Sequence, residues 1–444
     1  MRKKIFIAAT VLILLLLSFI GFLEYRQYSS YKVPIHAGAN TIIKINADAF
    51  VESFLKEYGF NFRKKISPPG KKEIDSAANA GIYIPANIFI YTMSSKSPST
   101  LFCTVPLSDV VNFKGFLRKK LGVSITGDGA ESHGTGFNDQ LTVLCSEDYA
   151  SFAYSPRKEE VLSVLQDLLN KKNLIASTDE LIKKLKEDRS HIVYAVKNGI
   201  ATAEFTGNQI LLHAGLIIPN AVAIPLQSRK RSIDSNTYAS FFLNLKPPVS
   251  FFKKEYTVKQ YSMETDSLLP GFNGYADIQV AGFSTQNDTV TTYEYNDNFE
   301  KTEKRTIATV QVPDINMAWD AGTSFLTYLQ KQQIVTTSQT INREVFPLYQ
   351  VTVQQAQQIL YFNTADHPVI NQQFENTPNF MELHIDFKKL QPSLDSSFLK
   401  KYLTGINRLT LYGKKSDTQV VSIQGSVDFG SSALKAVAEI IKAL

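Results

Sequence analysis

Cysteine, histidine and tryptophan are scarce in this 444-residue chain, which contains 2, 6 and 1 of them. Two cysteines cannot build a disulfide-rich scaffold or a four-thiolate zinc site. The histidines show no His-x-x-x-His spacing, so the helical zinc motif that needs it is excluded. The chain also has no Gly-x-Ser-x-Gly elbow, and a serine nucleophile therefore has no motif to support it. We expect a protein that is not an enzyme, with no cofactor and no metal.

An excess of one charge is lacking as well. The 47 basic and 41 acidic residues give a net charge of +6, which is too mild for a nucleic-acid-binding protein. Hydrophobic residues make up 44% of the chain, an ordinary share for a folded protein, so disorder throughout is excluded.

The long hydrophobic run of the sequence lies at its N-terminus. Arg2, Lys3 and Lys4 precede an uncharged stretch over residues 5–23, which as a helix would reach about 28 Å, the thickness of a bilayer core. The run is longer than the core of a signal peptide and does not end in small residues. It predicts an uncleaved transmembrane signal-anchor, with a buried core helix as the alternative.

The basic residues before the run favour one orientation. Residues 1–4 would stay cytoplasmic, and the rest of a single-pass protein of the bacterial inner membrane would lie in the periplasm. Residues 24–38 are polar and aromatic and are interpreted as a short stalk.

The second half of the chain repeats patterns of the first half in the same order, which indicates an internal duplication. Three pairs of segments match, beginning at Asn40 and Asn236, at Thr100 and Thr306, and at Gln140 and Gln350. In the second pair each strand ends in Val-Pro and a predicted helix follows. We predict module 1 over residues 39–226, a polar linker over 227–235 and module 2 over 236–444. Two unrelated β-rich domains are the alternative.

Hydrophobic periodicity predicts the elements of these modules. Helices are expected at residues 161–170, 178–188 and 432–444, and strands at 191–196, 200–205 and 420–429. The predicted fold class is α+β, with an N-terminal transmembrane helix followed by two related modules of mostly antiparallel sheet, whose helices pack on one face.

This layout, with the Gly-Ser-Val-Asp-Phe strand at residues 425–429 and a helix after it, resembles uncharacterised cell-envelope proteins of the Bacteroidota. The resemblance implies where this protein is located and how its chain is organised, but it assigns no functional residue. It also implies sites of O-glycosylation at the tripeptides that begin at Asp75, Asp266 and Asp288, for which ordinary turns are the alternative.

Two groups of side chains are candidates for chemistry. Strand alternation puts Glu382, His384 and Asp386 on one face, where they would form a metal or acid/base cluster or, alternatively, a polar solvated face. Cys103 and Cys145 are predicted to point into the core of module 1. They would form a disulfide if their strands are neighbours and would otherwise be two buried thiols.

These observations favour a membrane-anchored, non-catalytic interaction or scaffold protein of the envelope. Its partners would be the membrane, through residues 5–23, and other envelope proteins, with no nucleic acid. The alternative is an exported hydrolase or small-ligand-binding protein with a site between the modules.

Overall fold

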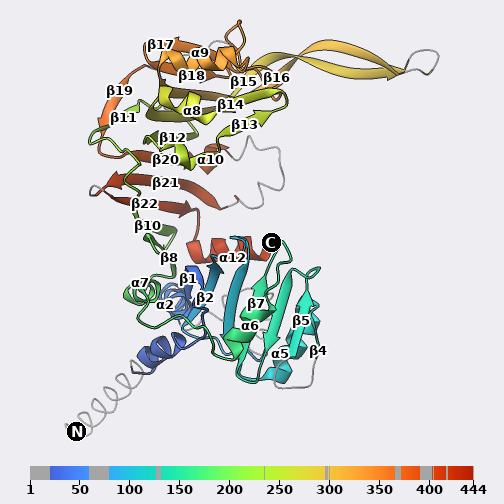
Figure 1. Ribbon diagram of the computed structural model, residues 1–444, viewed down its shortest axis with the longest axis vertical. Coiled ribbons are helices and arrows are strands. Elements are labelled where there is room, and N and C mark those ends of the chain that lie inside the picture. Colours follow the sequence, from blue (N-terminus) through green and yellow to red (C-terminus); the bar gives the residue numbers. More distant parts are fainter. Residues whose placement is uncertain are drawn as a thin grey trace. The chain divides into compact units, whose positions relative to one another are not determined.

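A computed structural model of the protein describes residues 21–59, 80–126, 132–234, 236–295, 299, 301–365, 372–390, 403, 405–416 and 419–443. The chain forms two compact units that divide between Gly207 and Asn208. Unit 1 comprises the described residues up to Gly207, and unit 2 comprises those from Asn208 onward. Figure 1 shows the elements of both units, coloured along the chain.

The predicted fold class, α+β with an N-terminal transmembrane helix and two modules covered by helices on one face, is wrong. Strand residues outnumber helical residues, and the sheets are antiparallel. Within the described ranges we find no helix with both the length and the apolar character needed to cross a bilayer. Of the predicted membrane segment over residues 5–23, residues 5–20 lie outside the described part of the chain.

Pro313 shows one physical reason for the error. It was expected to end a strand and open a helix, but β16 (Lys301–Ala321) runs through it. The register between β16 and β15 (Phe272–Tyr295) shifts between Val280 and Phe283, and Pro313 pairs with Phe283 beside that irregularity. A proline is tolerated there because the ladder is already interrupted. Helix α9 (Thr323–Lys331) begins only after β16 ends.

Unit 1 is built on an antiparallel sheet with the strand order β9-β8-β1-β2-β3-β7-β6-β5-β4. Its strands are β1 (Ala39–Asn46), β2 (Asn87–Met93), β3 (Leu101–Pro106), β4 (Ser124–Thr126), β5 (Ser132–Gly136), β6 (Leu141–Cys145), β7 (Tyr149–Tyr154), β8 (Ile192–Val196) and β9 (Gly199–Thr206).

The helices of unit 1 include α2 (Ala47–Tyr58), α5 (Val110–Leu121), α6 (Leu162–Leu169) and α7 (Glu180–Glu187). The carboxylate of Asp109 accepts from two backbone N–H groups at the start of α5, and Gly122 ends that helix in a left-handed conformation, as capping rules expect. Leu165 of α6 and Leu185 of α7 are fully buried in one core cluster with Phe89 of β2. The helices at residues 161–170 and 178–188 are thus confirmed, with ends shifted by one or two residues.

The strands of unit 2 are also antiparallel, and their order is β10-β22-β21-β20-β12-β15-β16-β18-β17. Besides β15 and β16, its strands are β10 (Gln209–Ile217), β12 (Ala239–Asn244), β17 (Thr352–Ala356), β18 (Ile359–Asn363), β20 (Met381–Asp386), β21 (Ile406–Lys415) and β22 (Val420–Phe429). Two small ribbons pair β11 (Ser228–Arg231) with β19 (Phe374–Thr377), and β13 (Glu255–Val258) with β14 (Tyr261–Glu264). Short helices α8 (Thr265–Leu268) and α10 (Phe387–Leu390) and the C-terminal α12 (Ala433–Ala443) complete the set.

Seven strands of each unit are arranged and connected in the same order. The order β9-β8-β1-β2-β3-β7-β6 in unit 1 has the same chain connections as β21-β20-β12-β15-β16-β18-β17 in unit 2. The three matching segment pairs lie on strands at equivalent positions, namely β1 and β12, β3 and β16, and the hairpins β6–β7 and β17–β18. Duplication itself stays a prediction.

The boundary between the units differs from the predicted one. The predicted module 1 ended at residue 226, yet β10 belongs to unit 2, where it pairs along its whole length with β22. The predicted linker over residues 227–235 contains β11, in which Ser228 and Arg231 are buried. These partners lie far away in sequence, so local composition could not identify them.

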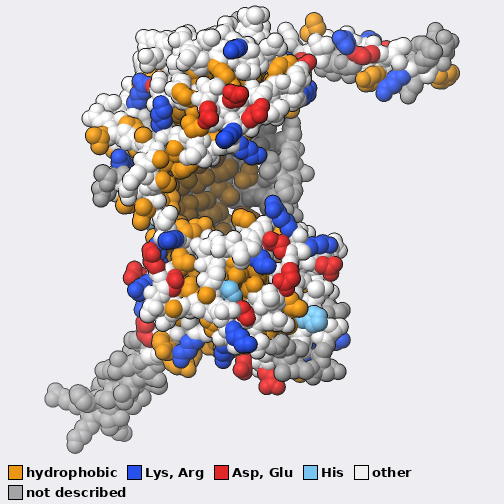
Figure 2. Space-filling view, viewed as in Figure 1, with side chains coloured by type: hydrophobic (Ala, Val, Ile, Leu, Met, Phe, Trp, Pro, Cys, Tyr) orange, Lys and Arg blue, Asp and Glu red, His pale blue; other side chains and the backbone are white. Residues whose placement is uncertain are grey.

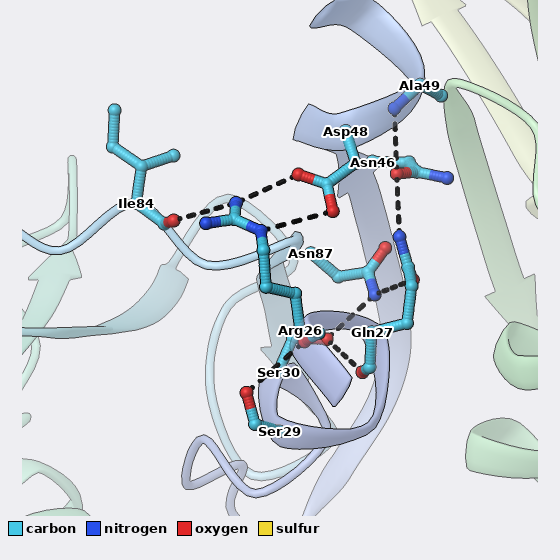
Figure 3. Close-up of polar contacts among 9 residues, drawn as sticks. All are labelled: Arg26, Gln27, Ser29, Ser30, Asn46, Asp48, Ala49, Ile84 and Asn87. Carbon is cyan, nitrogen blue, oxygen red and sulfur yellow. Dashed lines mark hydrogen bonds and ion pairs between the residues drawn. The ribbon is translucent and has the colours of Figure 1, made fainter. Parts of the chain in front are cut away.

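The predicted stalk over residues 24–38 is part of unit 1. Residues 21–30 are helical, and Figure 3 shows this helix tied to the junction between β1 and α2. Arg26 forms a two-pronged ion pair with Asp48, with Nη2 2.8 Å from Oδ1 and Nε 3.3 Å from Oδ2. Farther along the former stalk, Val33 and Ile35 are buried in the core.

The buried side-chain amide of Asn87 also binds the helix at residues 21–30. Nδ2 of Asn87 donates to Oε1 of Gln27 and to Oγ of Ser30, each at 2.8 Å. Both contacts are drawn in Figure 3. A docked helix that uses polar side chains for its contacts has the same composition as a solvated stalk, which explains the misinterpretation.

Candidate functional site

A polar groove of about 380 Å³ lies over β12, β20 and β21 of unit 2. Glu382, His384 and Asp386 of β20 all line it, so the prediction that they share one face is confirmed. The strand register places Ser240 of β12 and Thr410 of β21 on either side of His384. The groove is therefore walled by polar side chains from three neighbouring strands.

Of the three residues, Glu382 has the most hydrogen bonds to its side chain. Its Oε1 accepts from Nδ2 of Asn379 at 2.7 Å and from Oγ1 of Thr377 at 3.2 Å, while Nζ of Lys230 donates to Oε2 at 3.1 Å. Burial raises the pKa of this carboxyl, but the hydrogen bonds from His384, Asn379 and Lys230 outweigh burial and lower the pKa to about 2. Glu382 is thus a fixed anion at neutral pH. The solvated-face interpretation is wrong for it, because its side chain is buried.

The other two residues have structural contacts of their own. Nε2 of His384 lies 3.5 Å from Oε2 of Glu382, and its ring packs edge-on against Tyr412. Oδ1 of Asp386 accepts from the backbone N–H of Lys389 at 3.1 Å, in the first turn after the strand. A carboxyl with a pKa near 2 is a poor proton shuttle at neutral pH, and no group of three metal-ligating side chains occurs among the described residues. Glu382 therefore gives the groove a fixed negative charge.

Strand β11 supplies the cations that sequence reasoning assigned to a linker. Lys230 contacts Glu382, Arg229 pairs with Asp320, and Arg231 pairs with Asp277, its Nη2 lying 2.6 Å from Oδ1. The run Arg-Lys-Arg was visible in the sequence, but its carboxylate partners lie on three distant strands. A buried network of this kind leaves no local signal except the run itself.

The two cysteines are free thiols. Cys103 lies on β3 and Cys145 on β6, and β7 lies between these strands, pairing with both. Two strand spacings amount to roughly 9.5 Å, beyond the reach of a disulfide, for which the Cα atoms must lie within about 7 Å. The disulfide is therefore not formed. Burial raises the pKa of both thiols, and that of Cys103 to about 12.

An apolar cavity of about 250 Å³ lies elsewhere in unit 2. Its walls come from the β13–β14 ribbon, the α8 region, β15, β16 and α9, and they are almost entirely hydrophobic. The larger lining residues are Phe252, Tyr256, Met263, Leu268, Trp319 and Phe325. None of the predicted site residues lies in this cavity, and no periodicity in the sequence indicates it.

The most exposed element of unit 2 is the ribbon of β15 and β16. β12 pairs with β15 only up to Val280, and β18 pairs with β16 only from Asn316 onward. Beyond these points the two strands pair with each other as far as Tyr295 and Lys301, a span of roughly 45 Å. Figure 1 shows this ribbon projecting from the sheet of unit 2.

The ribbon carries exposed hydrophobic side chains among its charges, as Figure 2 shows. Phe299 is 86% exposed and Ile307 is 80% exposed. Lys301 lies over the ring of Tyr293 with Nζ 4.0 Å from its centroid, and Lys304 pairs with Glu294 at 2.8 Å. Cross-strand pairs of this kind stabilise a ribbon that has no sheet beneath it.

Two of the three glycosylation tripeptides fall on described residues. Ser267 in α8 and Thr289 at the base of the ribbon are both exposed. The tripeptide that begins at Asp75 lies outside the described residues. Glycosylation at these positions stays a prediction.

Comparison with known proteins gives no family for this chain. No family model matches it, and no curated protein matches it significantly. Crystal form IV of a protein designated TP0453 aligns at 11% identity over 42% of this chain and 80% of that chain, with a TM-score of 0.28. Crystal form III of the same protein aligns at 9% identity over 74% and 92% of the two chains, with a TM-score of 0.23. Likeness at this level carries no conclusion about fold or function.

Proposed function

We propose that the protein is a non-catalytic interaction protein of a bacterial cell envelope, held at the membrane, which contacts its partners through the β15–β16 ribbon. The ribbon is the observation that carries the proposal. An isolated two-stranded ribbon is marginally stable in water, and the exposed aromatic and aliphatic side chains along it stabilise it little. Contact with another molecule would cover these side chains.

The location rests on the sequence. The cationic residues 2–4 and the uncharged run over residues 5–23 are typical of a segment that holds a protein in a membrane with its bulk exported. The resemblance to Bacteroidota envelope proteins supports the same location. Extraction of membranes with alkaline carbonate tests it, because a membrane-inserted protein stays in the pellet and a peripheral one is released.

The ribbon is tested by shortening it. Val290 and Thr306 are paired across the ribbon, so replacing residues 291–305 by Asn-Gly closes a two-residue hairpin that keeps the register. We expect this variant to fold like the wild type and to lose the envelope proteins that cross-link to the wild type in membranes. A point variant, Phe299→Ser, should weaken the same cross-links.

Leu226→Ser is the matched control, because Leu226 is also a strongly exposed hydrophobic residue of unit 2, at 96%, and lies outside the ribbon. Recovery of the same partners with the shortened ribbon would refute the proposed role.

Binding of a small apolar ligand is a second candidate function, favoured by the cavity around Trp319. Such pockets are lined mainly by hydrophobic and aromatic side chains. A bound acyl chain would change the fluorescence of Trp319, the one tryptophan of the chain. Absence of any change during titration with fatty acids of increasing length would count against this role.

A further inference from the structure

A second groove, of about 400 Å³, lies in unit 1 beside the helix at residues 21–30. It is lined by both charged and aromatic side chains. Those that enter the argument are Glu24, Tyr31, Lys32, Lys44, Lys186 and Arg189.

Cationic side chains outnumber the carboxylates in this groove. Lys32, Lys44, Lys186 and Arg189 face only Glu24 and Asp188. Glu24 is neutralised by Arg189, whose Nη2 lies 3.1 Å from Oε1. Asp188 accepts from the backbone N–H of Ser190 at 2.8 Å. Four cations against two carboxylates leave the groove with an excess of positive charge.

Two of these cations are available to an anion, although Nζ of Lys186 also donates to the carbonyl oxygen of Ser177 at 3.5 Å. Lys32 and Lys186 are exposed, and neither forms an ion pair with a carboxylate of the described residues. They lie instead over tyrosine rings, with Nζ of Lys32 4.7 Å from the centroid of Tyr28 and Nζ of Lys186 5.5 Å from that of Tyr31. Ammonium groups held at the rim by aromatic rings are suited to a phosphate, to which lysine binds as a point charge.

The buried Lys44 adds a fixed positive charge at the wall of the groove. It is 2% exposed, and its Nζ donates to the carbonyl oxygen of Leu185 at 2.6 Å and to that of Asp188. Burial lowers the pKa of this ammonium to about 8, so a nearby anion would stabilise its charged form.

The position of the groove along the chain points to the source of the anion. Glu24, the partner of Arg189, directly follows the uncharged run over residues 5–23. Lys32 comes eight positions after Glu24, so at 1.5 Å per helical residue the groove lies within roughly 12 Å of the end of the run. A head-group layer about 5 to 8 Å deep would cover the end of the groove at Glu24, and the long flexible side chain of Lys32 can reach back toward it.

We propose that this groove binds a phosphate ester anion, supplied by the head group of an anionic phospholipid. The inference rests on the proposed attachment to the membrane. It assigns Lys32, Lys186 and Arg189 as the groups that hold the phosphate, with the tyrosines at the interface.

The test uses the full-length protein in detergent, titrated with short-chain phosphatidylglycerol, short-chain phosphatidylcholine or inorganic phosphate. Occupancy is read by mass spectrometry as protection of the Lys32 amine against an acylating label. Lys56, an exposed lysine of α2, serves as the internal reference. We expect phosphatidylglycerol to protect Lys32 and phosphatidylcholine to leave it reactive. If inorganic phosphate also protects Lys32, the result would support binding of phosphate by the groove. The source of the anion would then be a soluble phosphate and not a lipid.

Variants sharpen the test. Lys186→Gln and Arg189→Gln should each weaken protection of Lys32 about fivefold, whereas Lys119→Gln, at an exposed position of α5, should leave it unchanged. Equal protection by the zwitterionic lipid, no protection by any ligand, or no loss in Lys186→Gln would overturn the proposal. Failure of membrane attachment is seen separately, as release of the protein by alkaline carbonate.

Discussion

Among the described residues, each unit buries one long cation, and the two units satisfy that cation in different ways. Lys44 on β1 of unit 1 donates to the main-chain carbonyls of Leu185 and Asp188. Arg231 on β11 of unit 2 pairs with the carboxylate of Asp277 at 2.6 Å and also donates to Asn316. Both cations are 2% exposed.

This difference shows that the partner of a buried cation decides how easily the cation loses its proton. Carbonyl dipoles offset only part of the cost of desolvating an ammonium, so the pKa of Lys44 falls to about 8. A guanidinium beside a carboxylate stays charged throughout the accessible pH range. Unit 1 should therefore respond to alkaline pH through Lys44, and unit 2 should be more vulnerable to loss of a single partner.

The chain contains separate reporters for the two units. Both cysteines lie in unit 1, and the one tryptophan, Trp319, lies in unit 2. Buried thiols with raised pKa values react slowly, so thiol labelling reports the opening of unit 1. Fluorescence of Trp319, which packs against Phe362, reports the unfolding of unit 2.

The largest effect is expected from breaking the buried ion pair of unit 2. Arg231→Leu leaves the carboxylate of Asp277 buried without its cation, which should lower the free energy of unfolding of unit 2 by about 3–5 kcal/mol. Trp319 fluorescence during denaturation with urea measures the loss. The comparison between the units fails if thiol labelling shows that unit 1 loses as much.

Arg229→Leu provides the control for this prediction. Arg229 also lies on β11 and pairs with Asp320, but its side chain is 43% exposed. Ion pairs with one exposed partner contribute about 1 kcal/mol or less. A loss as large as that of Arg231→Leu would show that burial does not set the difference.

The next effect is the alkaline response of unit 1. Lys44 has a folded-state pKa of about 8 and an ordinary value of 10.5, so between these pH values the unfolded chain binds more protons than the folded one. The contribution of Lys44 to the stability of unit 1 should therefore rise by up to about 3 kcal/mol from pH 8 to pH 10.5, whereas the raised pKa of Cys103 lowers the stability above about pH 9. The rise should vanish in Lys44→Met. Denaturation midpoints from thiol labelling at each pH measure it, and an unchanged slope in the variant would assign the rise to other groups.

A somewhat smaller effect, of the same sign but in the acidic range, is expected in unit 2. The pKa of Glu382 is lowered from 4.5 to about 2, so the stability that its ionised form contributes is present above about pH 4.5 and is lost as the pH falls toward 2. The loss should be about 2–3 kcal/mol. Glu382→Gln should flatten the acid limb of the Trp319 denaturation profile. His384→Gln is the milder companion variant, since it removes one of several donors.

The smallest expected effect is that of a reductant. Because Cys103 and Cys145 lie on strands separated by β7, dithiothreitol should leave the denaturation midpoint of unit 1 unchanged. Cys145→Ala should also behave the same with and without it. A midpoint that falls on reduction would mean that the thiols approach each other after all.

Sequence patterns predicted well wherever the signal is short in range. The helix at residues 161–170 and the strand at residues 420–429 match α6 and β22, because apolar periodicity reflects the neighbours on one face of one element. The shared face of Glu382, His384 and Asp386 was predictable for the same reason. Their roles were not, since Lys230, which pairs with Glu382, lies 152 positions away in the chain.

Predictions failed where a partner far away in the chain decides the structure. Pro313 was taken as a helix start, but it lies at a register shift created by the opposite strand. Residues 24–38 were taken as a stalk, but Asp48 and Asn87 fasten the helix at residues 21–30.

By itself, the sequence determined the apolar run, the alternation of strand faces, the helices at residues 161–170 and 178–188 and the absence of known catalytic motifs, because each depends on residues within about one turn or one strand of each other. Tertiary structure alone decided where unit 1 ends, which carboxylate meets Arg231, how far apart the thiols lie and that β15 and β16 project as a ribbon. These depend on which strands pair. Pairing is decided by the burial and register of segments that can lie more than 200 residues apart, such as β10 and β22, and no local pattern encodes it.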